Sequence, residues 1–416
     1  MKKIAVIGAG ISGLTTANLV RKKADVVVYE KNSIPGGLIK CQRINGSLFH
    51  TCGGHVFNSK IPEVLDWFWS LFNQSQDFVK AERNSVVYMS EGEKIPYPIE
   101  NHMYLFDEEI QRNFIDDLIT ISEKQKNVKP QNFEEFLKGR FGPTLYGMYF
   151  KPYNEKVWKR DLRSVPLSWL EGKLPMPTVQ EMIYNNINHV KEKSFVHSSF
   201  WYEKKDGSQL IADRLAEGLD IRYNTDITTV IRKDNKWIVE DEIYDKVVFC
   251  GNIKDMVQMI DGVDIEDYKQ PIANLEYHGT TAVFCEIDKN PYSWIYMPGK
   301  EHESHRIICT GNFSETNNDK SLQEGRISAT IEFTDEINKE DILKNLKRIP
   351  FNPKYIDHKY NKYTYPIQNA NTRTIIKDLK SVLALYDFNF TGRFADWEYY
   401  NMDVAMWAAI ELCKHI

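Results

Sequence analysis

The chain has 416 residues, of which 42% are hydrophobic and 27% charged, and its formal net charge at pH 7 is −5. This length favours two or three domains, and the composition is that of an ordinary soluble globular protein. The negative charge argues against a nucleic-acid-binding surface, which usually carries a basic excess. No run of 18 or more apolar residues occurs, so we expect no transmembrane segment.

The six cysteines have no Cys-x-x-Cys spacing and no neighbouring histidine cluster. This argues against a zinc site and against a disulfide framework, and we expect no bound metal. The apolar N-terminal run is interrupted by glycines, which suits a phosphate-binding loop better than a signal peptide. Together these features predict a cytoplasmic protein.

A β–α–β unit opens the chain. Residues 3–7 predict a buried strand, residues 11–21 a helix with apolar residues at helical spacing, and residues 25–30 a second strand. Parallel strands joined by a helix indicate a doubly wound sheet.

From residue 62 to residue 189 the pattern becomes helical and rich in aromatic residues. The predicted helices cover residues 62–72, 107–125 and 132–141. Asn132, followed three residues later by a glutamate, has the spacing of a capping box at the start of the third helix. We interpret this part as an inserted helical domain.

Strand patterns return at residue 220. They predict strands over 227–232, 236–240 and 246–251, with a turn at Asp234-Asn235. Residues 280–365 contain further strand-like runs, which are typical of an antiparallel sheet. The tail predicts a strand over 381–386, a turn at Gly392 and a helix over 402–415.

We therefore expect an α/β fold with three domains: a doubly wound, Rossmann-like domain, an inserted helical domain and an antiparallel sheet domain. The predicted boundaries are 1–59 with 195–270 and 369–416 for the first domain, 60–194 for the second, and 271–368 for the third. We expect the functional site where the three meet, since ligand sites often form between domains.

The sequence after the first strand predicts a dinucleotide site. Gly8, Gly10 and Gly13 form a Gly-x-Gly-x-x-Gly pattern at the start of the predicted helix. These glycines allow a tight turn, a close approach to a pyrophosphate and close helix–strand packing, with helix N–H groups aimed at the phosphates. Glu30 ends the second strand, 17 residues after Gly13. Its carboxylate is placed to accept hydrogen bonds from a ribose hydroxyl.

A glycine pair, Gly36-Gly37, follows this acidic strand end, and Gly392-Arg393 precedes the C-terminal helix. Both features are typical of amine-oxidase-like flavoproteins, in which the arginine serves the pyrophosphate or the flavin. We therefore predict FAD as the cofactor.

With these features in place, the sequence resembles the UDP-galactopyranose mutases, and its motif pattern is nearest to their eukaryotic-type branch. The matching segments are Gly53-Gly54-His55-Val56-Phe57, Ile95–Ile99 with Asn101, Lys151–Trp158, Trp294–Pro298 with Arg306, Tyr363–Pro366, and Gly392–Tyr399. The C-terminal loop after Tyr399 is shorter than in the eukaryotic-type branch and closer to the bacterial form.

The resemblance implies roles for matching residues. The implied catalytic residues are His55, Arg306, Tyr365 and Tyr399. The implied substrate-binding residues are Tyr97, Asn154, Trp158, Lys173, Tyr296, Arg306, Tyr365 and Tyr399. The cofactor-binding residues, from the motifs and the resemblance together, are Gly8, Gly10, Ser12, Gly13, Glu30, Lys31, Gly37, Leu38, His55, Arg393, Asn401 and Met402.

In this interpretation Trp158 stacks on the uracil and Asn154 hydrogen-bonds the nucleotide. Arg306 and Lys173 hold the diphosphate, two tyrosines donate hydroxyls to it, and His55 lies beside the flavin on a loop that moves with the redox state. Lys173 stands where the family has an arginine, which keeps the charge but loses the bidentate fork.

The implied activity is interconversion of the pyranose and furanose forms of a UDP-sugar, of the UDP-galactopyranose/UDP-galactofuranose type, as in cell-surface polysaccharide biosynthesis. Reduced flavin N5 would attack the anomeric carbon as UDP leaves, and the flavin–sugar adduct would open and reclose before UDP returns. NADH or NADPH is the expected external reductant.

Two other interpretations stay open. One is a flavin-dependent oxidoreductase of the amine-oxidase or desaturase class, since one scaffold hosts many chemistries. The other is a non-catalytic nucleotide-sugar binder that keeps FAD as a structural group. The sugar, the choice between uridine and thymidine, and assembly into a homo-oligomer are not fixed by the sequence.

Overall fold

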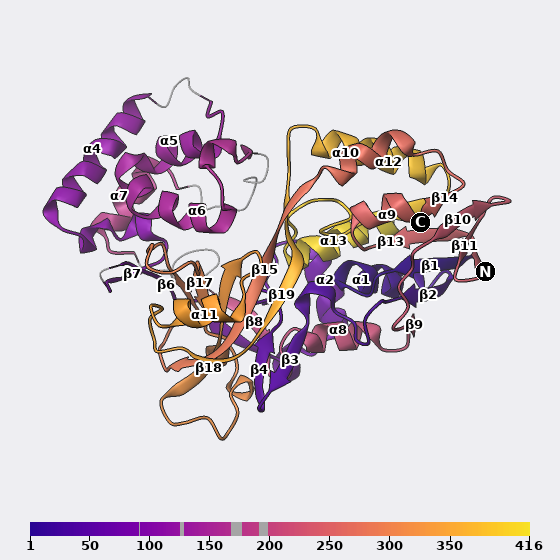
Figure 1. Cartoon of the computed structure of the whole chain (residues 1–416), viewed down its shortest axis with the longest axis horizontal. Helices are drawn as coiled ribbons and strands as arrows, with labels where there is room; N and C mark the ends of the chain where they lie inside the picture. The colour runs from indigo at the N-terminus through magenta and orange to yellow at the C-terminus, as the bar shows by residue number, and fades with distance from the viewer. Residues whose placement is uncertain (91, 125–128, 168–176, 191–198) are drawn as a thin grey trace.

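The computed structural model describes residues 1–90, 92–124, 129–167, 177–190 and 199–416. Figure 1 shows three parts: a group of helices, a long twisted sheet, and a layered α/β part that contains both termini. Among the described residues, no helix is both long enough and apolar enough to cross a lipid bilayer.

A five-stranded parallel sheet in the order β20-β13-β1-β2-β9 forms the centre of the α/β part. Its strands are β1 (Lys3–Ile7), β2 (Asp25–Tyr29), β9 (Asp220–Arg222), β13 (Lys246–Phe249) and β20 (Phe388–Phe390). The sheet thus joins segments from the beginning, the middle and the end of the chain. The predicted Rossmann-like, doubly wound fold class is confirmed.

Both faces of this sheet are buried, which is why its strands are apolar on both sides. In β1, Ile4 and Val6 pack into one cluster, whereas Ala5 and Ile7 pack into the other. The helices contributing to the first cluster are α1 (Ile11–Val20), α2 (Pro62–Leu71), α8 (Gln209–Ala216) and α13 (Met402–Cys413).

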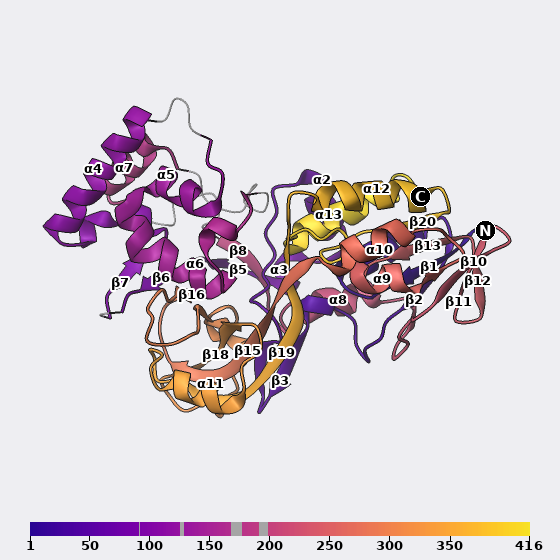
Figure 2. The ribbon, with the colours of Figure 1, turned by 45° about the horizontal axis from the view of Figure 1, so that its top comes forward.

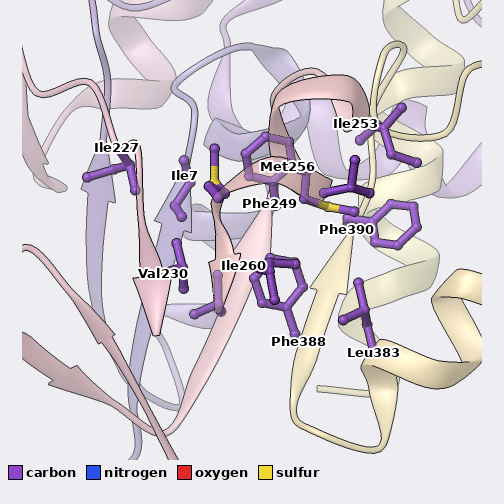
Figure 3. Close-up of a cluster of buried hydrophobic side chains, with 14 of the residues drawn as sticks. Ile7, Ile227, Val230, Phe249, Ile253, Met256, Ile260, Leu383, Phe388 and Phe390 are labelled. Carbon is purple, nitrogen blue, oxygen red and sulfur yellow. The ribbon is translucent and has the colours of Figure 1, made fainter. Parts of the chain in front are cut away.

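Three further helices cover the second face: α9 (Ile253–Met259), α10 (Glu266–Ala273) and α12 (Thr372–Ala384). They lie together over the sheet in both views (Figure 2). Figure 3 shows Phe249 of the sheet, Met256 of α9 and Leu383 of α12 within one buried cluster. The apolar face of each of these helices is therefore buried in the same hydrophobic core.

A four-stranded sheet in the order β12-β11-β10-β14 extends from this part. Its strands are β10 (Val230–Lys233), β11 (Lys236–Val239), β12 (Glu242–Tyr244) and β14 (Ile260–Asp261). The predicted turn between β10 and β11 is confirmed, since Asp234 and Asn235 both have positive φ, 49° and 58°. Such a pair gives the tight hairpin turn that suits the twist of two antiparallel strands.

The helical part contains α4 (Glu108–Lys124), α5 (Phe133–Leu145), α6 (Lys151–Trp158) and α7 (Val179–Ile187). Of the predicted capping box at the start of α5, the Asn132 cap is confirmed, whereas the Glu135 carboxylate accepts from the residue before the N-cap instead of from the Asn132 N–H. Asn132 accepts a hydrogen bond from the Glu135 N–H at 3.0 Å, and the Glu135 carboxylate accepts one from the Gln131 N–H at 2.9 Å. Pro152 occupies the first turn of α6, where its missing N–H costs nothing.

Between α2 and α4 the structure differs from the prediction of a continuous helical region. After the short α3 (Gln74–Asp77) the chain forms β5 (Phe78–Glu82), β6 (Ser85–Tyr88) and β7 (Lys94–Pro96). The helical prediction was wrong for this stretch because the strands are stabilised by distant partners. β6 pairs in parallel with β16 (Trp294–Tyr296), and β5 pairs with β8 (Ser199–Glu203).

A seven-stranded sheet in the order β19-β15-β18-β17-β16-β6-β7 forms the third part. Its remaining strands are β15 (Glu276–Asp288), β17 (Arg306–Ile308), β18 (Arg326–Thr334) and β19 (Lys354–Ile367), and α11 (Lys339–Leu346) packs on one face. The pairs from β19 to β16 are antiparallel, as predicted. A separate hairpin, β3 (Cys41–Ile44) with β4 (Ser47–His50), lies beside this sheet.

In the tail, the predicted strand over residues 381–386 was wrong. Residues 372–384 form α12, and the strand β20 begins only at Phe388. Ile376, Leu379 and Leu383 recur at helical spacing and are buried. This longer helical pattern determines the structure here, and the short apolar run on which the strand prediction was based lies within and after the helix. The predicted C-terminal helix is confirmed as α13.

Candidate active site

The glycine turn after β1 has the geometry that a dinucleotide loop requires. Gly8 has a φ of 104°, in the region that favours glycine. A Cβ on Gly13 would lie 1.9 Å from the carbonyl oxygen of Gly8, so α1 packs against the turn more closely than any side chain permits. The Gly36 N–H donates to the carbonyl of Ala9 at 2.8 Å, and this brings the second glycine pair onto the same turn.

Glu30 is buried at the end of β2 and is tied to the glycine turn. One carboxylate oxygen accepts from the Ala9 N–H at 2.8 Å, and the other accepts from the Asn32 N–H at 3.0 Å. The carboxylate is therefore held in a fixed orientation beside the turn. Sequence reasoning missed Asn32, which orients this group, while the predicted neighbour Lys31 is exposed.

A cavity of about 230 Å³ opens at the turn. The predicted cofactor residues in its wall are Gly10, Ser12, Gly37, Leu38, His55, Arg393, Asn401 and Met402. The other predicted cofactor residues of this region, Gly8, Gly13 and Glu30, do not line the cavity but stabilise the turn through the contacts described above. The wall also includes Asn252, Tyr363 and Tyr400, to which the sequence analysis assigned no role in cofactor binding.

Two helices begin at this cavity. The N-cap residues of α1 and α13 are Gly10, which has no side chain, and Asn401, whose side chain accepts no hydrogen bond from its helix. The first N–H groups of both helices thus stay available, and the helix dipoles add partial positive charge there. This is the arrangement that binds a phosphate or a pyrophosphate.

His55 and Arg393 come from distant parts of the sequence, and both line the cavity. Among the described residues, the buried Nε2 of His55 and Nε of Arg393 have no hydrogen-bond partner. Burial, with the nearby charge of Arg393, lowers the pKa of His55 to about 4, so the ring is neutral at pH 7. Because both atoms belong to residues of the cavity wall, they leave hydrogen-bonding capacity for a bound ligand, and the polar ring atoms of a flavin fit it.

The predicted diphosphate residues form one contiguous group. Arg306 donates from Nη2 to the hydroxyl of Tyr365 at 3.3 Å. The rings of Tyr365 and Tyr399 are stacked, with centroids 5.3 Å apart and planes 8° apart. The Arg393 guanidinium lies 4.0 Å from the centroid of the Tyr399 ring. These contacts connect the cavity wall to Arg306.

The charge states of this group follow from its burial. Burial opposes the charge on Arg306, but the Glu332 carboxylate raises the pKa of the guanidinium, which stays ionised. Burial raises the pKa of Tyr365, so its hydroxyl stays protonated and can donate a hydrogen bond. The group therefore presents cations and hydroxyl donors, the groups that bind a diphosphate.

An aromatic group lies next to Arg306. The rings of Tyr97 and Tyr296 have centroids 5.0 Å apart, and Tyr153 meets Tyr296 edge-on at 5.8 Å. Arg83 donates from Nη2 to the Tyr296 hydroxyl at 3.0 Å. Sequence reasoning assigned no role to Arg83 or Tyr153, although Tyr153 stands inside the segment Lys151–Trp158 that carried the resemblance.

The predicted nucleotide-binding residues of α6 are covered in this structure. Trp158 is 7% exposed and packs in the core of the helical part, and the Asn154 side chain donates to the Phe150 carbonyl at 2.7 Å. Stacking of uracil on Trp158 therefore requires that core to open, and the role stays a prediction. Lys173 lies outside the described residues.

Lys156 connects α6 to the loop that precedes Arg306, a contact that the sequence analysis did not predict. Its ammonium group donates to the carbonyls of Met297 and Ser304 at 3.0 and 2.9 Å. Burial lowers its pKa to about 8. The helical part and the sheet are thus joined beside the aromatic group.

Comparison with known proteins shows which proteins the chain is similar to. Residues 6–74 match the NAD(P)-binding Rossmann-like domain. The chain is 21% identical to a UDP-galactopyranose mutase of Mycoplasma genitalium, with 99% of this chain and 94% of the relative covered. It is 23% identical to a dTDP-fucopyranose mutase of Escherichia coli, with 100% and 98% covered.

Solved structures agree on the fold. A crystal structure of reduced UDP-galactopyranose mutase superposes with a TM-score of 0.87 at 20% identity and covers all of this chain and 95% of that one. A putrescine oxidase superposes with a TM-score of 0.64 at 14% identity, with 100% and 98% covered. The expectation of a mutase-like enzyme is confirmed by the full-length relatives, and the chain resembles the UDP-galactopyranose mutases from one end to the other.

Proposed function

We propose that the protein is an FAD-dependent mutase that interconverts the pyranose and furanose forms of a nucleotide-linked sugar. The observation that carries this proposal is the continuous contact from Arg393 in the cavity wall, through the Tyr399 and Tyr365 rings, to Arg306. A second cation with two phenol hydroxyls complements the negative charge and acceptor oxygens of a glycosyl diphosphate, whereas an amine substrate, itself a cation, would be repelled by it.

The chain's own residues would act on the leaving group. As the bond between the anomeric carbon and the diphosphate breaks, negative charge grows on the phosphate oxygen. Arg306 with the hydroxyls of Tyr365 and Tyr399 would stabilise that charge and hold the nucleotide until it returns. The tyrosines Tyr97 and Tyr296 would enclose the sugar and exclude water from it.

The cofactor would lie along the cavity. Its pyrophosphate would meet the N-termini of α1 and α13, its ribose the Glu30 carboxylate, and its ring His55 and Arg393. When bound and reduced, FAD would supply the nucleophile for the anomeric carbon. We propose NADH or NADPH as the reductant.

The relatives support a class of substrate, but they do not agree on one sugar. The two full-length relatives are named for a UDP-linked and a dTDP-linked sugar. Because both carry a pyrimidine nucleoside diphosphate, we propose this class, with UDP-galactose as the first compound to test. We also propose a cytoplasmic location, a role in cell-surface polysaccharide synthesis and the three domains given above. All six thiols are free, which supports a reducing compartment.

The test is turnover by the anaerobic, dithionite-reduced holoprotein with UDP- and dTDP-linked furanoses, followed by chromatography. We expect conversion to the pyranose form with at least one of them and none with the oxidised protein. Absence of conversion for the whole panel, together with oxygen consumption on an amine, would instead establish the oxidoreductase.

A further inference from the structure

His278 carries an unused hydrogen-bonding atom beside the predicted diphosphate residues. It stands on β15 directly opposite Tyr365 of β19, and the side chains of such cross-strand partners lie next to each other on one face of a sheet. The residue is 8% exposed. Among the residues that the structure describes, its buried Nε2 has no hydrogen-bond partner. A buried polar atom is destabilising unless it is hydrogen-bonded, so this nitrogen calls for a ligand.

Asp335, which follows the end of β18, holds the other nitrogen of the ring. Nδ1 of His278 lies 3.2 and 3.1 Å from the two carboxylate oxygens of Asp335. The Gly279 N–H donates to the same carboxylate at 2.9 Å, and the Thr281 hydroxyl donates to the Asp335 carbonyl at 2.7 Å. These contacts fix Asp335 although its φ of 63° is in the left-handed region. Backbone in such a conformation persists where the surroundings fix it, and it is often found at functional sites.

The same contacts determine which nitrogen of His278 carries the proton. Burial opposes ionisation of Asp335, but the hydrogen bonds from His278 and from the Gly279 N–H lower the pKa of its carboxyl group, which is ionised at pH 7. An ionised carboxylate accepts hydrogen bonds and donates none, so Nδ1 carries the proton. In the neutral ring Nε2 is then an acceptor in a fixed orientation. It complements a hydroxyl or an N–H group, whereas phosphate oxygens are themselves acceptors.

The position of His278 narrows the choice of donor. On one side is Tyr365, whose hydroxyl accepts from Arg306. On the other side is α6, where the rings of Trp158 and His278 meet edge-on with centroids 6.4 Å apart. A nucleotide whose phosphates lie on Arg306 and which extends towards α6 places its ribose between these two sides, since the ribose is bonded directly to the diphosphate. The hydroxyls of the ribose are therefore the nearest donors to Nε2.

We propose that His278, oriented by Asp335, binds a ribose hydroxyl of the nucleotide and makes the site selective for the sugar of the nucleoside. The inference rests on the proposed function and deepens it, because it names the part of the substrate that this residue recognises. UDP has both a 2′- and a 3′-hydroxyl, whereas dTDP has only the 3′-hydroxyl. A contact with the 2′-hydroxyl would favour UDP-linked over dTDP-linked sugars, the two classes for which the relatives are named.

The test measures the binding of UDP, 2′-deoxy-UDP and 3′-deoxy-UDP to the oxidised holoprotein by calorimetry. None of these ligands carries a sugar to transfer, so binding is seen apart from turnover. Because Nε2 is covered in this structure, a nucleotide reaches it only by displacing neighbouring side chains, but that cost is common to the three ligands. For the wild type we expect one deoxy analogue to bind about three- to tenfold more weakly than UDP, the effect of one hydrogen bond.

His278→Phe keeps an aromatic ring against Trp158 and removes both nitrogens. Asp335 stays hydrated in this variant, because its side chain is 38% exposed. We expect the variant to bind UDP and both analogues with equal affinity. The matched control is His358→Phe, a histidine of β19 whose Nδ1 is hydrogen-bonded to the Tyr355 hydroxyl at 2.7 Å, and it should keep the wild-type preference. FAD content and thermal unfolding verify that each variant is loaded and folded.

A second variant removes the carboxylate instead of the ring. Asp335→Gly suits the φ of 63° and leaves the His278 ring without the group that orients it. We expect the preference for UDP over the weaker analogue to fall towards one. An unchanged preference in Asp335→Gly would contradict the proposal even if His278→Phe fails to fold.

The remaining outcomes separate this inference from the proposed function. A preference that persists in His278→Phe would overturn the proposal, and so would an equal loss of affinity for all three ligands, which would assign a phosphate contact to His278. Equal binding of UDP and both analogues by the wild type would refute the ribose contact alone. Wild-type protein that binds none of the three would refute the proposed function.

Discussion

The cofactor side and the diphosphate side of the site are built from different material. The cavity side is shaped by backbone: glycines at the turn, a second glycine pair against it and two uncapped helix N-termini. The diphosphate side is shaped by long side chains, above all Arg306, Tyr365 and Tyr399, which reach one another from separate strands and loops. Binding at the cavity side should therefore be lost when atoms are added to the backbone, and binding at the diphosphate side when side-chain atoms or charges are removed.

The largest effect is expected from adding one methyl group at the turn. In Gly13→Ala the new Cβ would meet the Gly8 carbonyl oxygen at 1.9 Å, and backbone cannot yield as a side chain can. We expect loss of bound FAD, measured by flavin absorbance per chain, and a large fall in thermal stability. Gly139→Ala is the control: nothing lies within 4 Å of that Cβ, and α5 should gain about 0.5–1 kcal/mol. FAD retention in Gly13→Ala would contradict the account.

The next effect comes from removing a charge on the other side. Arg306→Ala leaves Glu332 buried without its cation, which should cost about 3–5 kcal/mol of unfolding free energy. Adding Glu332→Gln should recover part of this stability in denaturant unfolding, while turnover stays at least about 100-fold reduced because the diphosphate cation is still missing. Recovery of turnover in the double variant would show that Arg306 serves the fold alone.

Parts of this contrast were readable from the sequence and parts were not. The glycine turn, Glu30 and the continuous apolar strands of the parallel sheet are local patterns, so their structure follows from nearby residues. Glu332 could not be found this way because its partners, Gly53 and Arg306, come from other elements. Likewise β6 was missed because it pairs with β16, far along the chain. Trp158 showed that a residue in a matching motif can still be covered by the core.

A pH-dependent effect tests the burial of a carboxyl group on β8. Glu203 of β8 is fully buried, and, among the described residues, both its carboxylate oxygens lack hydrogen-bond partners. Burial raises its pKa from 4.5 to about 8. The folded state therefore holds a proton that the unfolded chain releases above pH 4.5, so this group makes stability fall as the pH rises towards 8.

Glu203→Gln should remove that dependence. The variant should match the wild type near pH 4.5 and gain on it by about 1.4 kcal/mol for each pH unit up to pH 8. Denaturant unfolding at several pH values is the measurement. A constant difference across this range would mean that Glu203 is ionised in the folded protein. His50 has the opposite sign: burial lowers its pKa to about 3, so its contribution is lost as the pH falls below 6.5.

The smallest effect is expected in the helical part, away from both sides of the site. Asn132→Ala removes the cap of α5 and should lower stability by about 1 kcal/mol. FAD content and UDP affinity should not change, because α5 contributes no residue to the cavity or to the Arg306 group. A loss of UDP affinity in this variant would show that the helical part shapes the diphosphate side more directly than the contacts indicate.

The most direct test of the central claim compares wild type and Arg306→Ala at equal FAD loading, each oxidised and each reduced, with UDP-galactofuranose as substrate and chromatography of UDP-galactopyranose as the readout. The account predicts product from the reduced wild type alone. Equal turnover by the oxidised wild type, or by reduced Arg306→Ala, would contradict it.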